Sequence, residues 1–161
     1  MGFPCDAIDA FELNPRLVAA ANNKAQAIGA PYLRYFEADL NRPNLPEARY
    51  DVGIFFHSLH HVGNVEACLK AVKRSLKSDG LLLVVDFVGP NRHQWSDLQI
   101  SLAEHMLELL PPKYRVQAPS GFVNSKASRP TVEEVIRADP SEAIRSEDLM
   151  GCLRSEFREL E

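Results

Sequence analysis

Three histidines that follow an apolar run are the side chains of this sequence best suited to chemistry. The run Tyr50–Phe56 reads YDVGIFF, and His57, His60 and His61 come within the next five residues. Because an imidazole can give or take a proton near neutral pH, His57 is the candidate general base, ahead of His60, for a substrate hydroxyl or amine. Phe56 is expected to lie at the same site.

The same histidines raise the question of a metal site. A zinc site draws its ligands from His, Cys, Asp and Glu, and neither a carboxylate nor a cysteine stands at a companion spacing to His57, His60 and His61. We therefore expect no metal. A packing or capping role is the simpler expectation for His61.

Two apolar runs predict the strands that position these side chains. The run 50–56 is β-branched and aromatic with little alternation, which predicts a strand buried on both faces. A second run, 80–88, follows one helical segment, so strand, helix and strand form the βαβ unit of a parallel sheet. Ligands of such sheets bind at the carboxyl ends of the strands. The mouth of the site would be formed by Phe56, His57, Ser58 and Asp86.

Shorter patterns predict the flanking elements. The stretch 6–11 predicts a strand, and Asn14 with Pro15 predicts the start of a helix that ends at Gly29. The stretch 32–38 predicts a further strand, near a sheet edge because Arg34 needs solvent. Asn64 would cap the crossover helix. Helices are also predicted over 95–110, from Thr131 onward, and over 146–157. The stretch 119–130 is predicted to be a surface loop.

These elements predict an α/β fold with a Rossmann-like, mostly parallel sheet and flanking helices, followed by a helical C-terminal part. The length of 161 residues, with 45% hydrophobic and 25% charged residues, is typical of one globular domain. We expect a single domain over 1–161, with its core at 6–88 and its helical part at 89–161.

The net charge and the cysteine content indicate which classes of partner and which cellular compartment to expect. A net charge of −4 gives no basic footprint for nucleic acid, so the substrate is expected to be a small molecule. Three widely spaced cysteines favour neither a disulfide framework nor a zinc knuckle, which fits a reducing, cytoplasmic setting. No apolar run is long enough to cross a membrane. A homo-oligomer is left open.

Four segments, taken in order, resemble the class I S-adenosylmethionine-dependent methyltransferases. The resemblance covers 6–88, about half of the chain. The last segment has Asp79-Gly80 where the family usually has Pro-Gly. The four segments are FELNP (11–15), FEADL (36–40), YDVGIFFHSLHHV (50–62) and LKSDGLLLVVDF (76–87).

The resemblance implies that Glu12 holds the ribose hydroxyls of the cofactor and that Asp39 lies near its adenine amine. A carboxylate is a good acceptor for two vicinal hydroxyls, and Asp9, which falls inside its strand, ranks behind Glu12. The alternatives are a solvated turn acid at Glu12 and, at Asp39, an acid that binds nearby backbone N–H groups. The implied residues for S-adenosyl-L-methionine are Glu12, Asp39, Leu40, Phe56 and His57.

The segment GPNRHQW (89–95) follows a strand end at which the family's substrate-facing groups lie. The resemblance therefore implies that Arg92, His93 and Trp95 face the methyl acceptor. The alternative is that Trp95 covers the core and Arg92 is solvated.

The departure from the family is the missing first strand and Gly-rich loop. None of the eight glycines forms a GxGxG pattern. In the family the missing strand lies mid-sheet, between the counterparts of 6–11 and 50–56. Either these two strands pair directly, another chain fills the gap, or the sequence is a fragment whose sheet is truncated at both ends.

The resemblance implies methyl transfer from S-adenosylmethionine to an oxygen, nitrogen or carbon of a small molecule. Such a displacement at an activated sulfonium rests on positioning, so no catalytic triad is needed. The alternative is a non-catalytic methyltransferase-like module that binds a partner or serves as a scaffold. A nicotinamide-dependent enzyme is disfavoured, because its fingerprint needs the same missing glycines.

Overall fold

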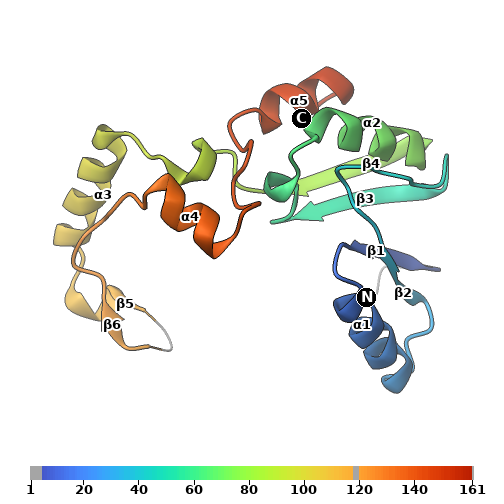
Figure 1. Ribbon diagram of the computed structural model, residues 1–161, viewed down its shortest axis with the longest axis horizontal. Coiled ribbons are helices and arrows are strands. Elements are labelled where there is room, and N and C mark those ends of the chain that lie inside the picture. Colours follow the sequence, from blue (N-terminus) through green and yellow to red (C-terminus); the bar gives the residue numbers. More distant parts are fainter. Residues whose placement is uncertain (1–4, 118–119, 161) are drawn as a thin grey trace. The chain divides into compact units, whose positions relative to one another are not determined.

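The computed structural model describes residues 5–117 and 120–160 (Figure 1). The chain divides into two compact units, each made of two segments. The first unit is Met1–Gly53 with Asn64–Leu82, and the second is Ile54–Gly63 with Leu83–Glu161. The expected single domain, with a boundary at 88, stays a prediction.

The first unit begins with a strand, a helix and a strand: β1 (Ile8–Glu12), α1 (Pro15–Ala27) and β2 (Leu33–Glu37). The Asn14 side chain accepts a hydrogen bond from the Arg16 backbone N–H at 3.0 Å, which caps α1, and Pro15 takes its first position. After the helix, Gly29 adopts a left-handed φ of 69°, which a glycine allows without strain. The predicted strand, cap, helix and strand are confirmed here.

β1 and β2 are parallel neighbours, and their register runs from Ile8 beside Leu33 to Glu12 beside Glu37. The Asn22 side chain of α1 both donates to the carbonyl and accepts from the N–H of Tyr35, at 2.9 and 3.0 Å. This amide therefore fastens the helix to β2.

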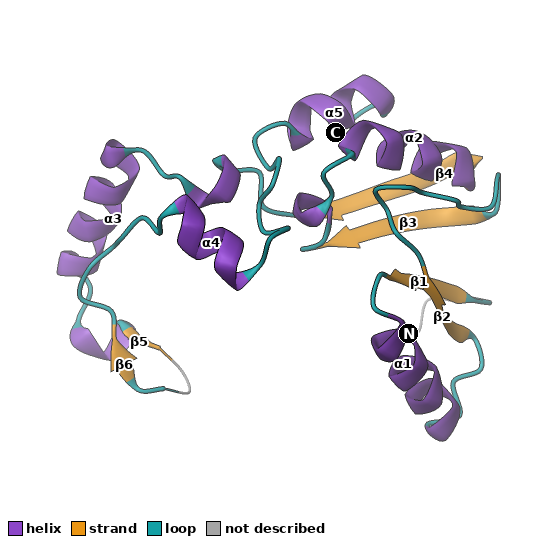
Figure 2. Ribbon diagram, viewed as in Figure 1, coloured by secondary structure: helices purple, strands orange, loops and turns teal. Residues whose placement is uncertain are grey.

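The second sheet pairs β3 (Tyr50–Phe56) with β4 (Leu76–Val85), and α2 (Val65–Ser75) connects them. The two arrows point the same way in Figure 2, as expected for a βαβ unit. Asn64 caps α2 by accepting from the Ala67 N–H at 3.4 Å. β4 begins four residues before the predicted Gly80 and ends three before Val88, because the chain passes from helix to strand without a separate turn.

The prediction that the strand at 50–56 is buried on both faces is wrong. Phe55 is 6% exposed, whereas Val52, Ile54 and Phe56 are 52, 63 and 68% exposed. Gly53, on the face of Phe55, lies against Val72 of α2. One helix layer covers only one face of a two-stranded sheet, and the described residues put no second layer on the other.

Three two-stranded sheets are formed within 5–117 and 120–160, namely β1 with β2, β3 with β4, and β5 (Val116–Gln117) with β6 (Phe122–Val123). The alternative in which the strand at 6–11 pairs directly with the strand at 50–56 is therefore wrong. The α/β class with short parallel sheets and flanking helices agrees with the predicted truncated Rossmann-like fold.

The C-terminal part is mainly helical, as predicted. Ser96 and Thr131 begin α3 and α4 with capping boxes that use Gln99 and Glu134. The predicted loop 119–130 holds the strand β6, which is too short to give a periodic signal; Pro119 lies outside the described residues. The elements are η1 (Leu59–His61) after β3, then η2 (Asn91–His93), α3 (Asp97–Leu109), η3 (Pro112–Tyr114), β5 (Val116–Gln117), β6 (Phe122–Val123), α4 (Val132–Ala138) and α5 (Leu149–Glu156).

None of the helices in the described part of the chain combines the length and the apolar character needed to span a membrane.

Candidate functional site

A buried carboxylate, Asp86, organises the turn that follows β3. Its side chain is 0% exposed and accepts hydrogen bonds from the backbone N–H groups of Ser58 (3.0 Å), Leu59 (2.7 Å) and Phe87 (2.7 Å). It is also bonded to Nδ1 of His60. Burial alone would raise the pKa of Asp86, but the His60 bond and the backbone donors outweigh it and lower that pKa.

Glu142 brings three histidines of the second unit together. His93 Nε2 lies 3.0 Å from Glu142 Oε1, and His60 Nε2 lies 3.5 Å from the same oxygen. His61 Nε2 lies 3.9 Å from Glu142 Oε2. The rings of His60 and His61 are in contact, with centroids 4.2 Å apart. We call His60, His61, His93 and Glu142 the histidine cluster.

The loop 139–144 is fixed to the other segments of the cluster by its backbone. The Ile144 N–H donates to the carbonyl of His60 at 3.2 Å, and the Arg92 N–H donates to the carbonyl of Ala143 at 2.8 Å. Arg92 Nη1 donates to the carbonyls of Pro140 and Glu142 at 2.8 and 2.9 Å. Glu142 is thus held by its backbone as well as by its side chain.

Four non-glycine residues of this region have left-handed backbone conformations. The φ angles are 49° at His57, 55° at Arg92, 56° at His93 and 46° at Ala143. Side chains rarely adopt such angles, and backbone strain of this kind gathers at functional sites. The strain and the histidine cluster mark the same segments of the second unit.

Phe56 and His57 lie beside the cluster in sequence but are not part of it. The Phe56 ring is 68% exposed and meets the His57 ring edge-on at 4.7 Å. The His57 N–H donates to the carbonyl of Val85 at 2.8 Å, while its side chain is exposed. The imidazole is therefore accessible to a small molecule, as a general base must be.

The three residues predicted to face the acceptor lie close together but differ in their contacts. The His93 ring packs on Phe87 at 4.8 Å and is nearly parallel to the Trp95 ring at 6.4 Å. Trp95 meets Phe87 edge-on at 5.3 Å. Arg92 is half-buried and bonded to the loop carbonyls, so it is not simply solvated. His93 and Trp95 thus form an aromatic group, and Arg92 fixes the loop behind it.

In the first unit, Glu12 and Asp39 lie at one edge of the parallel pair. Glu12 ends β1, its carbonyl accepts from the Ala38 N–H at 3.0 Å, and Asp39 comes two residues after β2. Glu12 Oε1 accepts from the Asn14 N–H at 2.8 Å, and Asp39 Oδ1 accepts from the Asn41 N–H at 2.9 Å. These bonds agree with the structural alternatives for both acids, and each involves one oxygen of the carboxylate.

Asp9 is occupied by ion pairs. Its side chain is 3% exposed, pairs with Arg34 and Arg49, and accepts from the Tyr50 hydroxyl at 3.0 Å. Burial alone would raise the pKa of Asp9, but the bonds from Tyr50 and Arg34 lower it. Asp9 is thus a poor candidate for a ligand group, in keeping with its rank behind Glu12.

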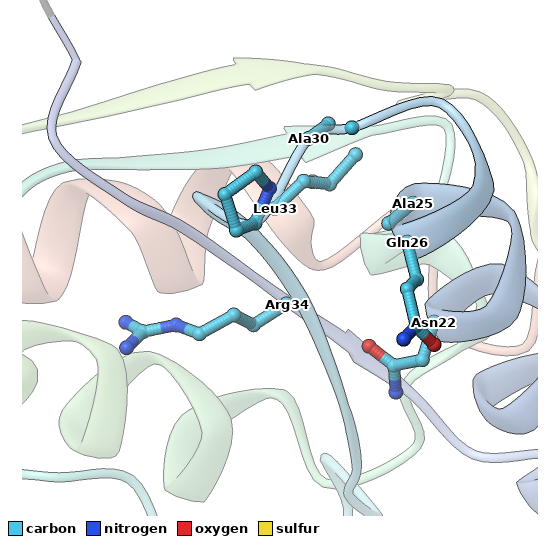
Figure 3. A pocket seen from close by; sticks show the side chains of 8 residues that line it. Asn22, Ala25, Gln26, Ala30, Leu33 and Arg34 are labelled. Atoms are coloured by element: carbon cyan, nitrogen blue, oxygen red, sulfur yellow. The ribbon is translucent and has the colours of Figure 1, made fainter.

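A cavity of about 450 Å³ lies between α1 and the start of β2 in the first unit, and its lining includes Arg34, the partner of Asp9. Figure 3 shows Asn22 and Gln26 side by side on α1, with Arg34 extending away from them. The lining is otherwise mostly small and apolar, and no predicted site residue belongs to it. This cavity carries no chemistry of its own.

Sequence reasoning missed the loop residues that complete the histidine cluster. Ser141 lies 3.0 Å from His61 Nδ1, and its hydroxyl donates to Asp139 Oδ1 at 2.6 Å. Ser141 is 80 residues from His61. The only signal was an acid-rich segment, DPSE, at 139–142, and nothing in its spacing connects it to the histidines.

A family match and a curated relative both indicate a methyltransferase. Residues 4–84, just over half of the chain, match the family described as methyltransferase domain. Over 89 residues the chain is 28% identical to the ubiquinone/menaquinone biosynthesis C-methyltransferase UbiE of Caulobacter sp. (strain K31), which covers 55% of this chain and 34% of that protein.

Solved structures share the fold at low identity. A putative methyltransferase from Bacillus halodurans C-125 matches 96% of this chain and 54% of its own, with a TM-score of 0.59 and 19% identity. The YcgJ protein from Bacillus subtilis matches 83% of this chain and 51% of its own, with a TM-score of 0.51 and 22% identity. The chain spans about a third of the curated relative and about half of these two structures.

Proposed function

Because the chain belongs to the class I S-adenosylmethionine-dependent methyltransferase family, we propose that it binds S-adenosylmethionine and serves methyl transfer to a small-molecule acceptor. The observation that carries the proposal is the family match over 4–84, which includes both acids at the edge of the β1–β2 pair. The name of the curated relative denotes C-methyl transfer in ubiquinone and menaquinone biosynthesis, and this supports a small organic acceptor.

The donor set of the first unit fits the adenosine part of the cofactor. Glu12 and Asp39 follow neighbouring parallel strands at their carboxyl ends, where ligands of such sheets bind. Each carboxylate uses one oxygen for a local N–H and has acceptor capacity on the other. Glu12 would accept the ribose hydroxyls, Asp39 the adenine amine, and Leu40 would pack on the base.

The remaining predicted site residues have roles at the acceptor and at the transferred methyl group. The bound cofactor provides an activated methyl group on a sulfonium, so the protein has to orient the acceptor and exclude water. His57 is accessible and would take the proton that an acceptor hydroxyl or amine loses on methylation. Phe56 would pack beside the cofactor. His93 and Trp95 offer an aromatic surface for the acceptor, and Arg92 fixes that surface to the loop 139–144.

Calorimetric titration of the chain with S-adenosylmethionine and S-adenosylhomocysteine tests the proposal. We expect saturable binding that weakens roughly 10- to 100-fold in Glu12→Gln, because a charge-assisted hydrogen bond is lost, and by a smaller factor in Asp39→Asn. Glu37→Gln is the matched control, since Glu37 lies beside Glu12 in the register and is exposed. Its affinity should stay at the wild-type value.

Two results would contradict the proposal in different ways. If Glu12→Gln and Glu37→Gln bind equally well, the acids at this edge do not hold the cofactor. If the folded chain binds neither compound, the alternative of a non-catalytic module is favoured.

A further inference from the structure

The histidine cluster has a geometry that hydrogen bonds alone do not explain. Ligand atoms of His60, His61 and Glu142 all lie within 4.8 Å of one another. The His60 Nε2 to Oε1 distance of 3.5 Å and the His61 Nε2 to Oε2 distance of 3.9 Å exceed the usual 2.7–3.2 Å of an N–H···O bond. Both nitrogens nonetheless face the same carboxylate.

The protonation of the two rings follows from their other nitrogens. His60 Nδ1 bonds to the Asp86 carboxylate, which only accepts, so Nδ1 carries a proton. The Ser141 hydroxyl donates to Asp139, so its oxygen accepts from His61 Nδ1. In the neutral form of each ring, Nε2 would therefore hold a lone pair that faces a carboxylate oxygen. Such an arrangement is repulsive unless a positive charge lies between them.

A tetrahedral metal ion accounts for the separations. Zinc lies about 2.0–2.2 Å from nitrogen and oxygen ligands, so two ligands at a tetrahedral angle are about 3.3–3.6 Å apart. The distance of 3.5 Å from His60 Nε2 to Glu142 Oε1 falls in this range. His61 Nε2 faces the other carboxylate oxygen, Oε2, at 3.9 Å, so binding of one ion by all three side chains requires a movement of the His61 ring or of the carboxylate.

The surroundings of the two histidines also suit a metal. Histidine ligands usually donate their second ring N–H to a carboxylate or another acceptor, which orients the ring. Asp86 does this for His60, and Ser141, backed by Asp139, does it for His61. The side chains of His61 and Glu142 are 34 and 29% exposed, so an ion can reach them from solvent.

We propose that His60, His61 and Glu142 bind a divalent transition-metal ion of the zinc class, with Asp86 and Ser141 orienting the two rings and His93 holding Glu142. Two imidazoles and a carboxylate are a borderline donor set that suits zinc or cobalt and disfavours magnesium and calcium. Three protein ligands leave a fourth position for water or a ligand oxygen. The sequence predicted no metal site because no carboxylate stands at a companion spacing to the histidines, and Glu142 is far from them along the chain.

The test is a titration of the chain with Zn²⁺, and with Co²⁺ as a spectroscopic probe, in a Cys5→Ser background. This background removes the exposed thiol, which is a competing zinc ligand. We expect one bound ion per chain and the visible absorption of tetrahedral Co²⁺. His61→Ala and Glu142→Gln should each weaken binding at least 100-fold, and Asp86→Asn by 10- to 100-fold.

His105→Ala is the matched control. His105 is exposed on α3 and lies 3.9 Å from Glu108, outside the cluster, so its removal should leave the affinity unchanged. If the folded chain binds no ion, or if His61→Ala and Glu142→Gln bind as the control does, the proposal is wrong. Protons on the rings would then be the charge that joins the cluster.

A second measurement needs no variant of the cluster. Acylation of histidines by diethyl pyrocarbonate, mapped by mass spectrometry, should be suppressed by Zn²⁺ at His61 and unchanged at His105. Equal acylation of His61 with and without Zn²⁺ would overturn the proposal even if a variant failed to fold. Neither experiment depends on binding of S-adenosylmethionine, so the two proposals fail separately.

Discussion

Asp9 and Asp86 are two almost inaccessible carboxylates that are stabilised by different means. Asp9, in the first unit, is paired with Arg34 and Arg49, which stay charged at any ordinary pH. Asp86, in the second unit, is held by three backbone N–H groups and by the imidazole of His60. One carboxylate is thus stabilised by ion pairs and the other mainly by backbone hydrogen bonds.

The partners of the two carboxylates also differ in their exposure to solvent. The side chains of Arg34 and Arg49 are 40 and 48% exposed, whereas His60 is 7% exposed. If Asp9 is removed, its partners can return to water. If Asp86 is removed, its part-buried N–H donors and His60 Nδ1 have less access to water than the guanidinium groups have. The same side chain deletion should therefore cost more in the second unit.

The largest effect is expected for Asp86→Ala. Loss of this acceptor leaves buried donors unpaired, so the free energy of unfolding should fall by roughly 3–5 kcal/mol. Urea unfolding followed by circular dichroism measures it. Asp79→Ala, at an exposed acid, serves as the control and should stay within about 0.5 kcal/mol of wild type.

Asp9→Ala should cost less, about 1–3 kcal/mol by the same urea measurement, because the exposed guanidinium groups regain water. Asp6→Ala is its control, at an exposed acid before β1. If Asp9→Ala lowers the free energy of unfolding as much as Asp86→Ala or more, this expectation is wrong.

Acid should destabilise both sites in the same direction. Each carboxyl has a folded-state pKa below its unfolded value of about 3.9, so its contribution is present above that pH and is lost as pH falls through the folded pKa. In Asp9→Asn and in Asp86→Asn, the free energy of unfolding should each time depend less steeply on pH below about pH 4 than in the wild type.

Salt distinguishes the two sites in this titration. At about 1 M salt the Debye length falls to about 3 Å, so the exposed arginine pairs of Asp9 should weaken. The buried bonds of Asp86 should change little. If salt changes the acid dependence of the free energy of unfolding equally at the two sites, their partners are equally screened and the expected difference is wrong.

The smallest effect is expected for Tyr50→Phe, about 0.5–1.5 kcal/mol, because one hydrogen bond to Asp9 is lost. Burial and the bond to Asp9 raise the pKa of Tyr50. Its contribution is therefore present below the unfolded pKa of about 10 and is lost as pH rises through the folded pKa. In alkaline unfolding experiments, the free energy of unfolding of Tyr50→Phe should therefore depend less steeply on pH than that of the wild type. Tyr32→Phe, at an exposed tyrosine, is the control.

Local signals predicted the local structure well. Asn14, Asn64 and Thr131 each cap a helix as expected, because a cap depends on residues within one turn. The parallel pair of β1 and β2 followed from strand, helix and strand in close succession. The prediction that the strand at 50–56 is buried on both faces was wrong, because the apolar composition of a strand cannot show whether a second layer of the fold covers it.

The candidate site could be predicted only in part, for the same reason. Ser58 and Asp86 were expected at one mouth, and the structure joins them by a hydrogen bond, since both end neighbouring strands of one βαβ unit. Glu142 was not expected, because an irregular loop places it and no periodicity governs such a loop. The proposed roles of His57 and Glu12 stay predictions.

The solvent-exposed face of the β3–β4 sheet should affect the tendency of the purified protein to self-associate. Six aliphatic and aromatic side chains that alternate along the two strands are each at least 41% exposed, namely Val52, Ile54, Phe56, Leu81, Leu83 and Val85. A contiguous apolar surface of this kind attracts other apolar surfaces, and a net charge of −4 opposes this only weakly. The colloidal behaviour of the purified chain should therefore depend on protein concentration and mild detergent more than on pH.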